Sequence, residues 1–84
     1  MPMTNKEKKN KLTLAFDRYN WSLRAVHRGE AIYLSVFNGA DKHMGDVILS
    51  EHGGYYRCFA DGLEPSLQKL FYSLVDGAIG TKED

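Results

Sequence analysis

The chain has 84 residues, of which 43% are hydrophobic and 26% are charged, and its formal net charge is zero. These values are typical of one small globular domain and exclude an intrinsically disordered chain. A single cysteine excludes an intramolecular disulfide, and small secreted domains usually carry several. The first ten residues lack the apolar segment of a signal peptide, and no apolar run is long enough to span a bilayer. We therefore expect a cytoplasmic protein.

Charge is unevenly distributed along the chain. Residues 1–28 hold seven basic and two acidic residues, whereas residues 29–84 hold four basic and nine acidic ones. A basic end of this kind suits phosphate groups, and an acidic remainder suits a basic partner. The alternative is that the two parts lie close together and partly neutralise one another.

Residues 4–20 fit either a helix or a strand. Thr4 and Glu7 match a capping box, and apolar residues then recur at helical spacing at Leu12, Ala15, Phe16 and Tyr19. Against the helix, Leu12, Leu14 and Phe16 alternate as they would in a strand. We favour the helix, and we expect a single domain over residues 1–84 with flexible ends at residues 1–10 and 80–84.

Residues 21–37 predict a β-hairpin. If Arg28 and Gly29 form a two-residue loop, one face collects the apolar side chains of Trp21, Leu23, Ala25, Ile32, Leu34 and Val36. The opposite face then carries Ser22, Arg24, Val26, Tyr33, Ser35 and Phe37. A slip of one residue would scatter the apolar set, so the pattern supports this assignment of faces.

Residues 46–60 predict a second hairpin, with Gly53 and Gly54 as its two-residue loop. In this register Leu49 pairs with Cys58 and Val47 pairs with Ala60. The core face then carries Val47, Leu49, Tyr56 and Cys58. The opposite face carries Ile48, Ser50, His52, Tyr55, Arg57 and Phe59.

A C-terminal helix is predicted from Pro65, which suits the first helical position, to Gly77, which suits the C-cap. Its apolar stripe consists of Leu67, Leu70, Phe71, Leu74 and Val75. The predicted fold is therefore an α+β, two-layer domain. It has a four-stranded antiparallel sheet of two hairpins, a C-terminal amphipathic helix across the apolar face, and an N-terminal helix.

No pattern of catalytic, metal-binding or phosphate-binding residues stands out. In the predicted second hairpin Cys58 faces the core and His52 faces away, so the thiol lacks a base. The available metal ligands lie at none of the usual spacings; they are Asp41, His43, Asp46, His52 and Cys58. The glycines form no phosphate-binding fingerprint. We therefore expect a protein that is not an enzyme and has no metal or other cofactor.

Binding is the stronger hypothesis. Tyrosine and arginine gather on the sheet face away from the C-terminal helix, and these residue types anchor interfaces. The predicted contact residues are Arg24, Tyr33, His52, Tyr55 and Arg57, with Asp41, Asp46 and Glu51 at the rim. The alternative is that the N-terminal helix or a second copy of the chain covers this face, because its apolar residues need shelter.

Two family resemblances accompany this reading. The order helix, strands, helix over residues 12–78 resembles the double-stranded RNA-binding domain. The resemblance implies that lysines at the start of the second helix contact phosphates. At these positions the sequence has one lysine, Lys69, together with Asp61 and Glu64. The stretch "GGYYRCFADGLEPSLQKLFYSL" is similar to the strand-then-helix end of HicB-like antitoxin domains. The overall profile resembles small accessory proteins of phages and mobile elements, anti-CRISPR proteins among them, many of which occlude a larger host protein.

We therefore expect a small non-enzymatic protein-binding module, an inhibitor or regulator that occludes a larger host protein. The alternative is a nucleic-acid-binding domain that binds RNA or DNA through its basic N-terminal region. Its contact residues would be Lys6, Lys8, Lys9, Lys11, Arg18 and Arg28, with Arg24 beside them. A third hypothesis is a homodimer that pairs through the aromatic face of the sheet.

Overall fold

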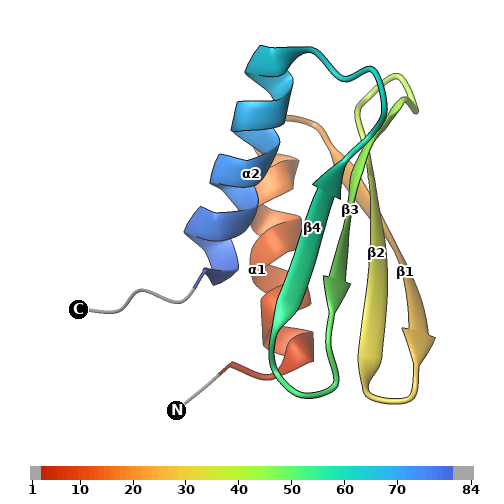
Figure 1. The fold of residues 1–84 in the computed structure, drawn as a ribbon, viewed down its shortest axis with the longest axis vertical. Coiled ribbons are helices and arrows are strands. Elements are labelled where there is room, and N and C mark those ends of the chain that lie inside the picture. The colour runs from red at the N-terminus through yellow and green to blue at the C-terminus, as the bar shows by residue number, and fades with distance from the viewer. Residues whose placement is uncertain (1–2, 81–84) are drawn as a thin grey trace.

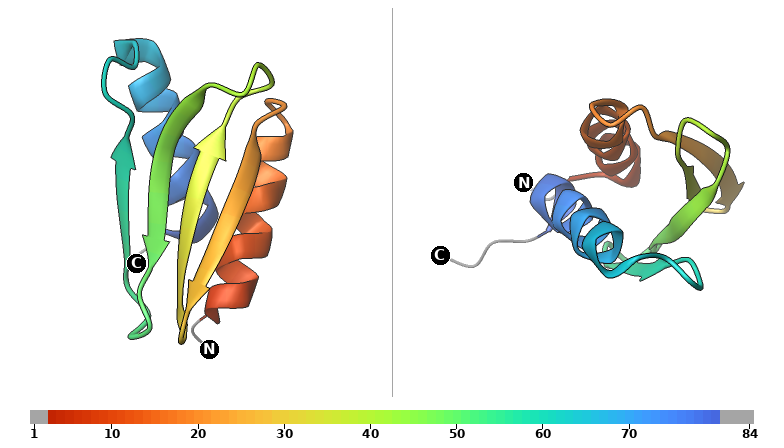
Figure 2. Two further views of the ribbon diagram at one scale, coloured as in Figure 1. Left: turned by 90° about the vertical axis from the view of Figure 1, so that its right-hand side faces the viewer. Right: turned by 90° about the horizontal axis from the view of Figure 1, so that it is seen from above.

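The computed structural model describes residues 3–80, which form two helices and one four-stranded antiparallel sheet (Figure 1). The elements are, in chain order, α1 (Asn5–Asp17), β1 (Ser22–Arg28), β2 (Ala31–Phe37), β3 (His43–Leu49), β4 (Tyr55–Phe59) and α2 (Pro65–Ile79). The strands lie in the sheet in sequence order. Both helices pack on the same face of the sheet (Figure 2). The predicted α+β, two-layer class is confirmed.

Helix α1 begins with the predicted capping box. The Glu7 N–H donates to Thr4 Oγ1 at 3.1 Å, and the Thr4 N–H donates to Glu7 Oε1 at 2.8 Å. The helix is therefore the correct choice for this segment, and residues 5–10, for which we expected flexibility, are helical. Of the other residues in the expected flexible ends, 3, 4 and 80 are described, whereas 1–2 and 81–84 lie outside the described residues.

The first turns of α1 hold both hairpin loops. Asn5 Nδ2 donates to the carbonyl oxygens of Glu30 at 2.8 Å and Ser50 at 3.0 Å. The Lys8 ammonium, which is buried, donates to the carbonyl oxygen of Gly53. Burying a polar group costs free energy unless the group is hydrogen-bonded. These contacts therefore fix the ends of both hairpins against the helix.

The first hairpin has the predicted faces in a slightly different register. Ala25 pairs with Leu34, and Arg28 pairs with Ala31, so the loop is Gly29 and Glu30 rather than Arg28 and Gly29. Gly29 has a φ of +60°, which the first central position of a tight hairpin turn requires. Each residue of β1 pairs with a residue two positions away from its expected partner. Because side chains alternate with a period of two, every side chain stays on its predicted face.

The second hairpin is the main correction. Leu49 pairs with Tyr55 and Val47 pairs with Arg57, so the loop spans residues 50–54. The predicted two-residue loop at Gly53 and Gly54 is wrong, and the shift is by an odd number of residues. Such a shift exchanges the two faces of the whole strand. Tyr56 and Cys58 therefore lie on the exposed face and not in the core.

Helix α2 starts at Pro65 as predicted but does not end at Gly77. It continues to Ile79, and the N–H of Gly80, the C-cap, donates to the carbonyl oxygen of Asp76 at 2.8 Å. Its buried residues are Phe71, Val75 and Ile79, which recur every four positions. The other members of the predicted apolar stripe are partly buried.

Aromatic rings join the two layers. Phe16 of α1 stacks on Trp21 with a centroid separation of 5.6 Å and on Phe71 of α2 with a separation of 5.8 Å. Phe71 lies close above Gly45 of β3, where a Cβ atom would come within 2.7 Å of the ring. The buried core consists of Leu12, Phe16, Trp21, Ile32, Leu34, Val36, Met44, Val47, Leu49, Leu63, Phe71, Val75 and Ile79.

Candidate functional site

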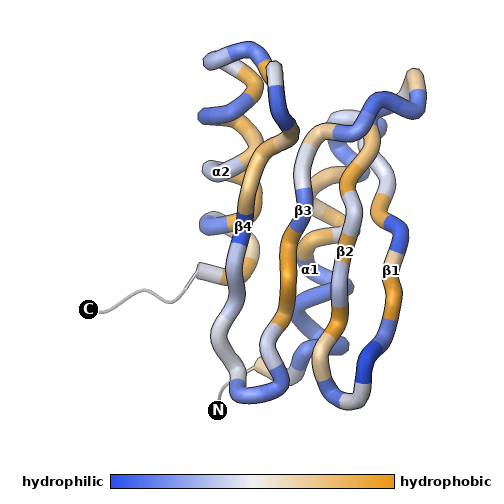
Figure 3. Tube along the Cα trace, turned by 45° about the vertical axis from the view of Figure 1, so that its right-hand side comes forward, coloured by the Kyte–Doolittle hydropathy of each residue, from blue (hydrophilic) through white to orange (hydrophobic). Residues whose placement is uncertain are grey.

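The sheet has one face without a helix, which we call the outer face. Both helices lie on the other side, and no segment within residues 3–80 covers the outer face (Figure 2). Hydrophobic and hydrophilic residues alternate along the strands that form this face (Figure 3). The alternative in which the N-terminal helix covers this face is therefore wrong.

One row of apolar and aromatic side chains crosses the whole outer face, and we call it the apolar row. Strand pairing places its members side by side from β1 to β4: Val26, Tyr33, Ile48 and Tyr56. Cross-strand neighbours have Cβ atoms about 5 Å apart, so the row is continuous. Tyr56 is 70% exposed, Val26 is 55% exposed and Tyr33 is 42% exposed.

Two arginines of β1 lie over aromatic rings of β2 on the outer face. The Arg24 guanidinium carbon is 4.3 Å from the centroid of the Phe37 ring, and that of Arg28 is 5.6 Å from the centroid of the Tyr33 ring. Arg24 also contacts Asp41 at 3.4 Å, although both side chains are largely exposed. These contacts hold the cations beside the β1 end of the apolar row.

A second row on the outer face is polar and places Cys58 of β4 beside Asp46 of β3. Asp46 Oδ1 lies 2.8 Å from His43 Nε2, and the His43 ring centroid is 5.4 Å from that of Phe37. The cysteine is exposed, contrary to the predicted core position. No three histidine, cysteine or carboxylate side chains among residues 3–80 are placed to hold a metal ion.

Tyr55 and Arg57 do not lie on the outer face. They face α2, where Arg57 pairs with Asp76 through Nε to Oδ1 at 2.8 Å and Nη2 to Oδ2 at 3.0 Å. Tyr55 donates its hydroxyl hydrogen to the same carboxylate at 2.7 Å, and Arg57 lies over the Tyr72 ring at 3.7 Å. Their predicted exposure on the face away from the C-terminal helix is wrong, because the register of β4 is shifted.

This contact network changes proton affinities. Burial raises the pKa of Tyr55 above 10.0, and the hydrogen bond to Asp76 raises it further, because a phenolate would face a carboxylate. The hydrogen bond to Asp76 raises the pKa of Arg57, which stays a cation. The network therefore holds α2 against β4 through an ion pair.

The remaining predicted site residues are dispersed. His52 lies in the loop between β3 and β4, where its N–H donates to Ser50 Oγ at 3.1 Å. Among the cations of the nucleic-acid alternative, Lys8 is buried against Gly53, and Arg28 lies on the outer face. The others belong to α1 or its C-cap, on the helical side of the sheet, and they are Lys6, Lys9, Lys11 and Arg18. The six cations therefore do not share one surface.

Sequence reasoning placed Arg24, Tyr33, Val26 and Ile48 on the outer face correctly and missed Tyr56. In the segment "YYRCF", aromatic residues occupy both odd and even positions. Alternation alone therefore does not decide whether the odd or the even positions are buried. What decides is a contact with a residue far along the chain. Arg57 faces α2 because Asp76 of that helix forms an ion pair with it.

The chain has no match among protein-family models, curated proteins or solved structures. No helix within the described residues is both long enough and apolar enough to cross a membrane.

Proposed function

We propose that the domain is a non-enzymatic protein-binding module that uses its outer face as the contact surface. The single observation that carries this proposal is the apolar row, which crosses all four strands, has three exposed members and is not covered by any segment within residues 3–80. Contiguous exposed apolar side chains mark interaction sites on soluble proteins, and tyrosine is enriched where the contact energy concentrates.

The charges around the apolar row favour a particular kind of partner. Arg24 and Arg28 flank the row at β1, and Asp46 lies in the polar row beside it. A partner surface with an apolar strip and acidic side chains near β1 would complement this arrangement. We propose further that the partner is a larger host protein and that binding inhibits or regulates it.

The test is affinity capture from the host lysate with the full chain, with and without nuclease, followed by titration of the captured protein. Tyr33→Ala combined with Tyr56→Ala removes two exposed rings of the apolar row and leaves the core intact. Tyr19→Ala is the matched control, because Tyr19 is 46% exposed but lies beyond α1 and not in the sheet. We expect nuclease-resistant capture with the wild type and the control, and at least tenfold weaker binding with the double variant. Equal binding by all three proteins would contradict the proposal.

Nucleic acid is the second candidate, because two arginines lie over aromatic rings on the outer face. Single-stranded RNA stacks its bases on such rings and pairs its phosphates with such cations. A mobility-shift series with RNA and DNA at increasing salt distinguishes the two functions. Capture that disappears with nuclease, with binding that falls steeply with salt, would favour this candidate. A dimer in sedimentation that the double variant abolishes would instead identify the outer face as a self-interface.

A further inference from the structure

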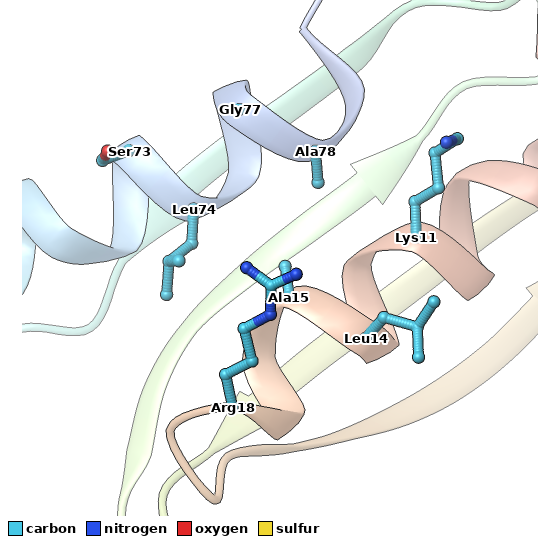
Figure 4. A pocket seen from close by; sticks show the side chains of 8 residues that line it. All are labelled: Lys11, Leu14, Ala15, Arg18, Ser73, Leu74, Gly77 and Ala78. Carbon is cyan, nitrogen blue, oxygen red and sulfur yellow. The ribbon is translucent and has the colours of Figure 1, made fainter.

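A groove of about 420 Å³ runs between the two helices, on the side away from the sheet (Figure 4). Its volume falls within the range of ligand-binding sites. Each helix contributes four residues, which are Lys11, Leu14, Ala15 and Arg18 from the α1 side and Ser73, Leu74, Gly77 and Ala78 from α2. The strands lie behind the helices in this view, so the groove and the outer face lie on opposite sides of the domain.

The middle of the groove is apolar and open. Ala15 of α1 and Leu74 of α2 lie on its facing walls, and Leu14, which is 68% exposed, forms the outer edge of the α1 wall with a side chain that points away from α2 (Figure 4). Small residues line the rest of the α2 wall, and a Cβ atom added at Gly77 would have no neighbour within 4 Å. The groove therefore has room for an aliphatic side chain from another molecule.

Both charged residues of the groove are cations. Lys11 and Arg18 are both exposed, and neither side chain forms a hydrogen bond or ion pair with another of residues 3–80. The Arg18 guanidinium extends over Ala15 into the space between the helices (Figure 4). Seven positions along a helix span two turns, or about 10 Å, so the cations lie toward the two ends of the apolar middle.

We propose that this groove binds an acidic peptide segment of a partner protein, with an aliphatic side chain between two carboxylates about 10 Å apart. A helical segment meets this requirement with acidic residues seven positions apart, and it would lie between α1 and α2 as a third helix. Single-stranded nucleic acid fits less well, because none of the described residues that line the groove has an aromatic ring on which a base could stack. This site is separate from the outer face and does not depend on the function proposed there.

The probe is a capped alanine-rich peptide with two glutamates seven residues apart and leucines at the third and fourth positions after the first glutamate. Its matched control carries lysines in place of the glutamates. Each is titrated into the isotope-labelled full chain and followed by NMR amide shifts, which detect binding up to millimolar dissociation constants. We expect the acidic peptide to shift the amides of Leu14, Ala15, Gly77 and Ala78, and the basic peptide to bind at least tenfold more weakly.

Two double variants with the same change in net charge locate the site. Lys11→Glu with Arg18→Glu reverses the groove cations, whereas Lys6→Glu with Lys9→Glu reverses two cations of α1 that do not line the groove. We expect at least tenfold weaker binding only for the first pair. Leu14→Gln, at an exposed position, should weaken binding without altering the fold, and circular dichroism checks that each variant is folded.

Three results would overturn the proposal. The first is no amide shift with the acidic peptide at millimolar concentration. The second is equal weakening by both double variants, which would mean that only net charge matters. The third is shifts at the groove with phosphatidylserine vesicles or single-stranded RNA but not with the peptide, which would assign the groove to a different class of ligand.

Discussion

Arg57 of β4 and Asp76 of α2 form a two-pronged ion pair, with nitrogen–oxygen distances of 2.8 and 3.0 Å. Paired hydrogen bonds of this geometry are stronger and more specific than a single contact between charges. The same carboxylate accepts the Tyr55 hydroxyl hydrogen, and the Tyr72 ring lies against the guanidinium. The network therefore specifies which residues of β4 face the helix, and with them which residues form the outer face.

Arg57→Met should destabilise the domain. The substitution keeps the length and apolar stem of the side chain but leaves Asp76 without its cation. A hydrogen bond to a charged group contributes about 1.5–3 kcal/mol, and partial exposure reduces this, so we expect a loss of about 1–2 kcal/mol in urea unfolding. Arg24→Met is the matched control, because Arg24 also lies over an aromatic ring but its contact with Asp41 is long and exposed, so we expect a loss of about 1 kcal/mol or less. Equal effects would contradict the structural role of Arg57.

Tyr55→Phe should change how stability depends on alkaline pH. The folded chain holds the Tyr55 proton more tightly than the unfolded chain, because the pKa of Tyr55 is raised above 10.0. This contribution is complete at neutral pH and is lost as the pH rises above about 10 through the raised pKa. The difference in unfolding free energy between the wild type and Tyr55→Phe should therefore shrink as the pH rises from 8 to 11, as urea titrations at each pH would measure.

The control for this experiment is Tyr56→Phe, which removes a phenol from the neighbouring residue on the exposed outer face. We expect a smaller change over the same pH range for this variant, because the hydroxyl that donates to Asp76 is that of Tyr55. A difference that shrinks equally in both variants would assign the pH dependence to tyrosines in general and not to the contact with Asp76.

Elements with strong local signals were predictable from the sequence. The capping box at Thr4 and Glu7 starts α1, and Pro65 starts α2. The first hairpin kept its faces because both of its strands alternate clearly, and a register change of two positions leaves alternation intact. These features depend on residues close together in the chain, so they could be inferred without knowledge of the packing.

The second hairpin was not predictable in the same way. Its glycine pair suggested a short loop, whereas Asn5 and Lys8 of α1 bind a longer loop at Ser50 and Gly53. The end of α2 was misplaced for a related reason. Gly77 suits a C-cap by itself, but burial of Ile79 in the core favours one more turn of helix. In both cases tertiary contacts outweighed a local glycine signal.

Gly45→Ala should destabilise the domain strongly. A Cβ atom at this buried position would lie 2.6 Å from the carbonyl oxygen of Cys58 and 2.7 Å from Phe71 Cζ. One of these contacts is with backbone, which cannot simply rotate away, so we expect a loss of about 1–3 kcal/mol or more in urea unfolding. Gly54→Ala is the control, since a Cβ atom there meets nothing within 4 Å, and it should be neutral or slightly stabilising. A neutral Gly45→Ala would contradict the close approach of Phe71 to β3.

Cys58 should react with thiol reagents in the native protein. It lies exposed on the outer face, whereas burial in the core would slow its modification until the chain unfolds. We expect Ellman's reagent to modify it within a few fold of the rate in denaturant, and Cys58→Ser to change stability by about 0.5 kcal/mol or less. Because Cys58 follows two residues after Tyr56 on the same face, a bulky maleimide there should also weaken binding of a partner to the outer face. Slow modification of the native protein would contradict this register and favour the one with a two-residue loop at Gly53 and Gly54. Rapid modification without any effect on binding would mean that the partner does not contact this end of the apolar row.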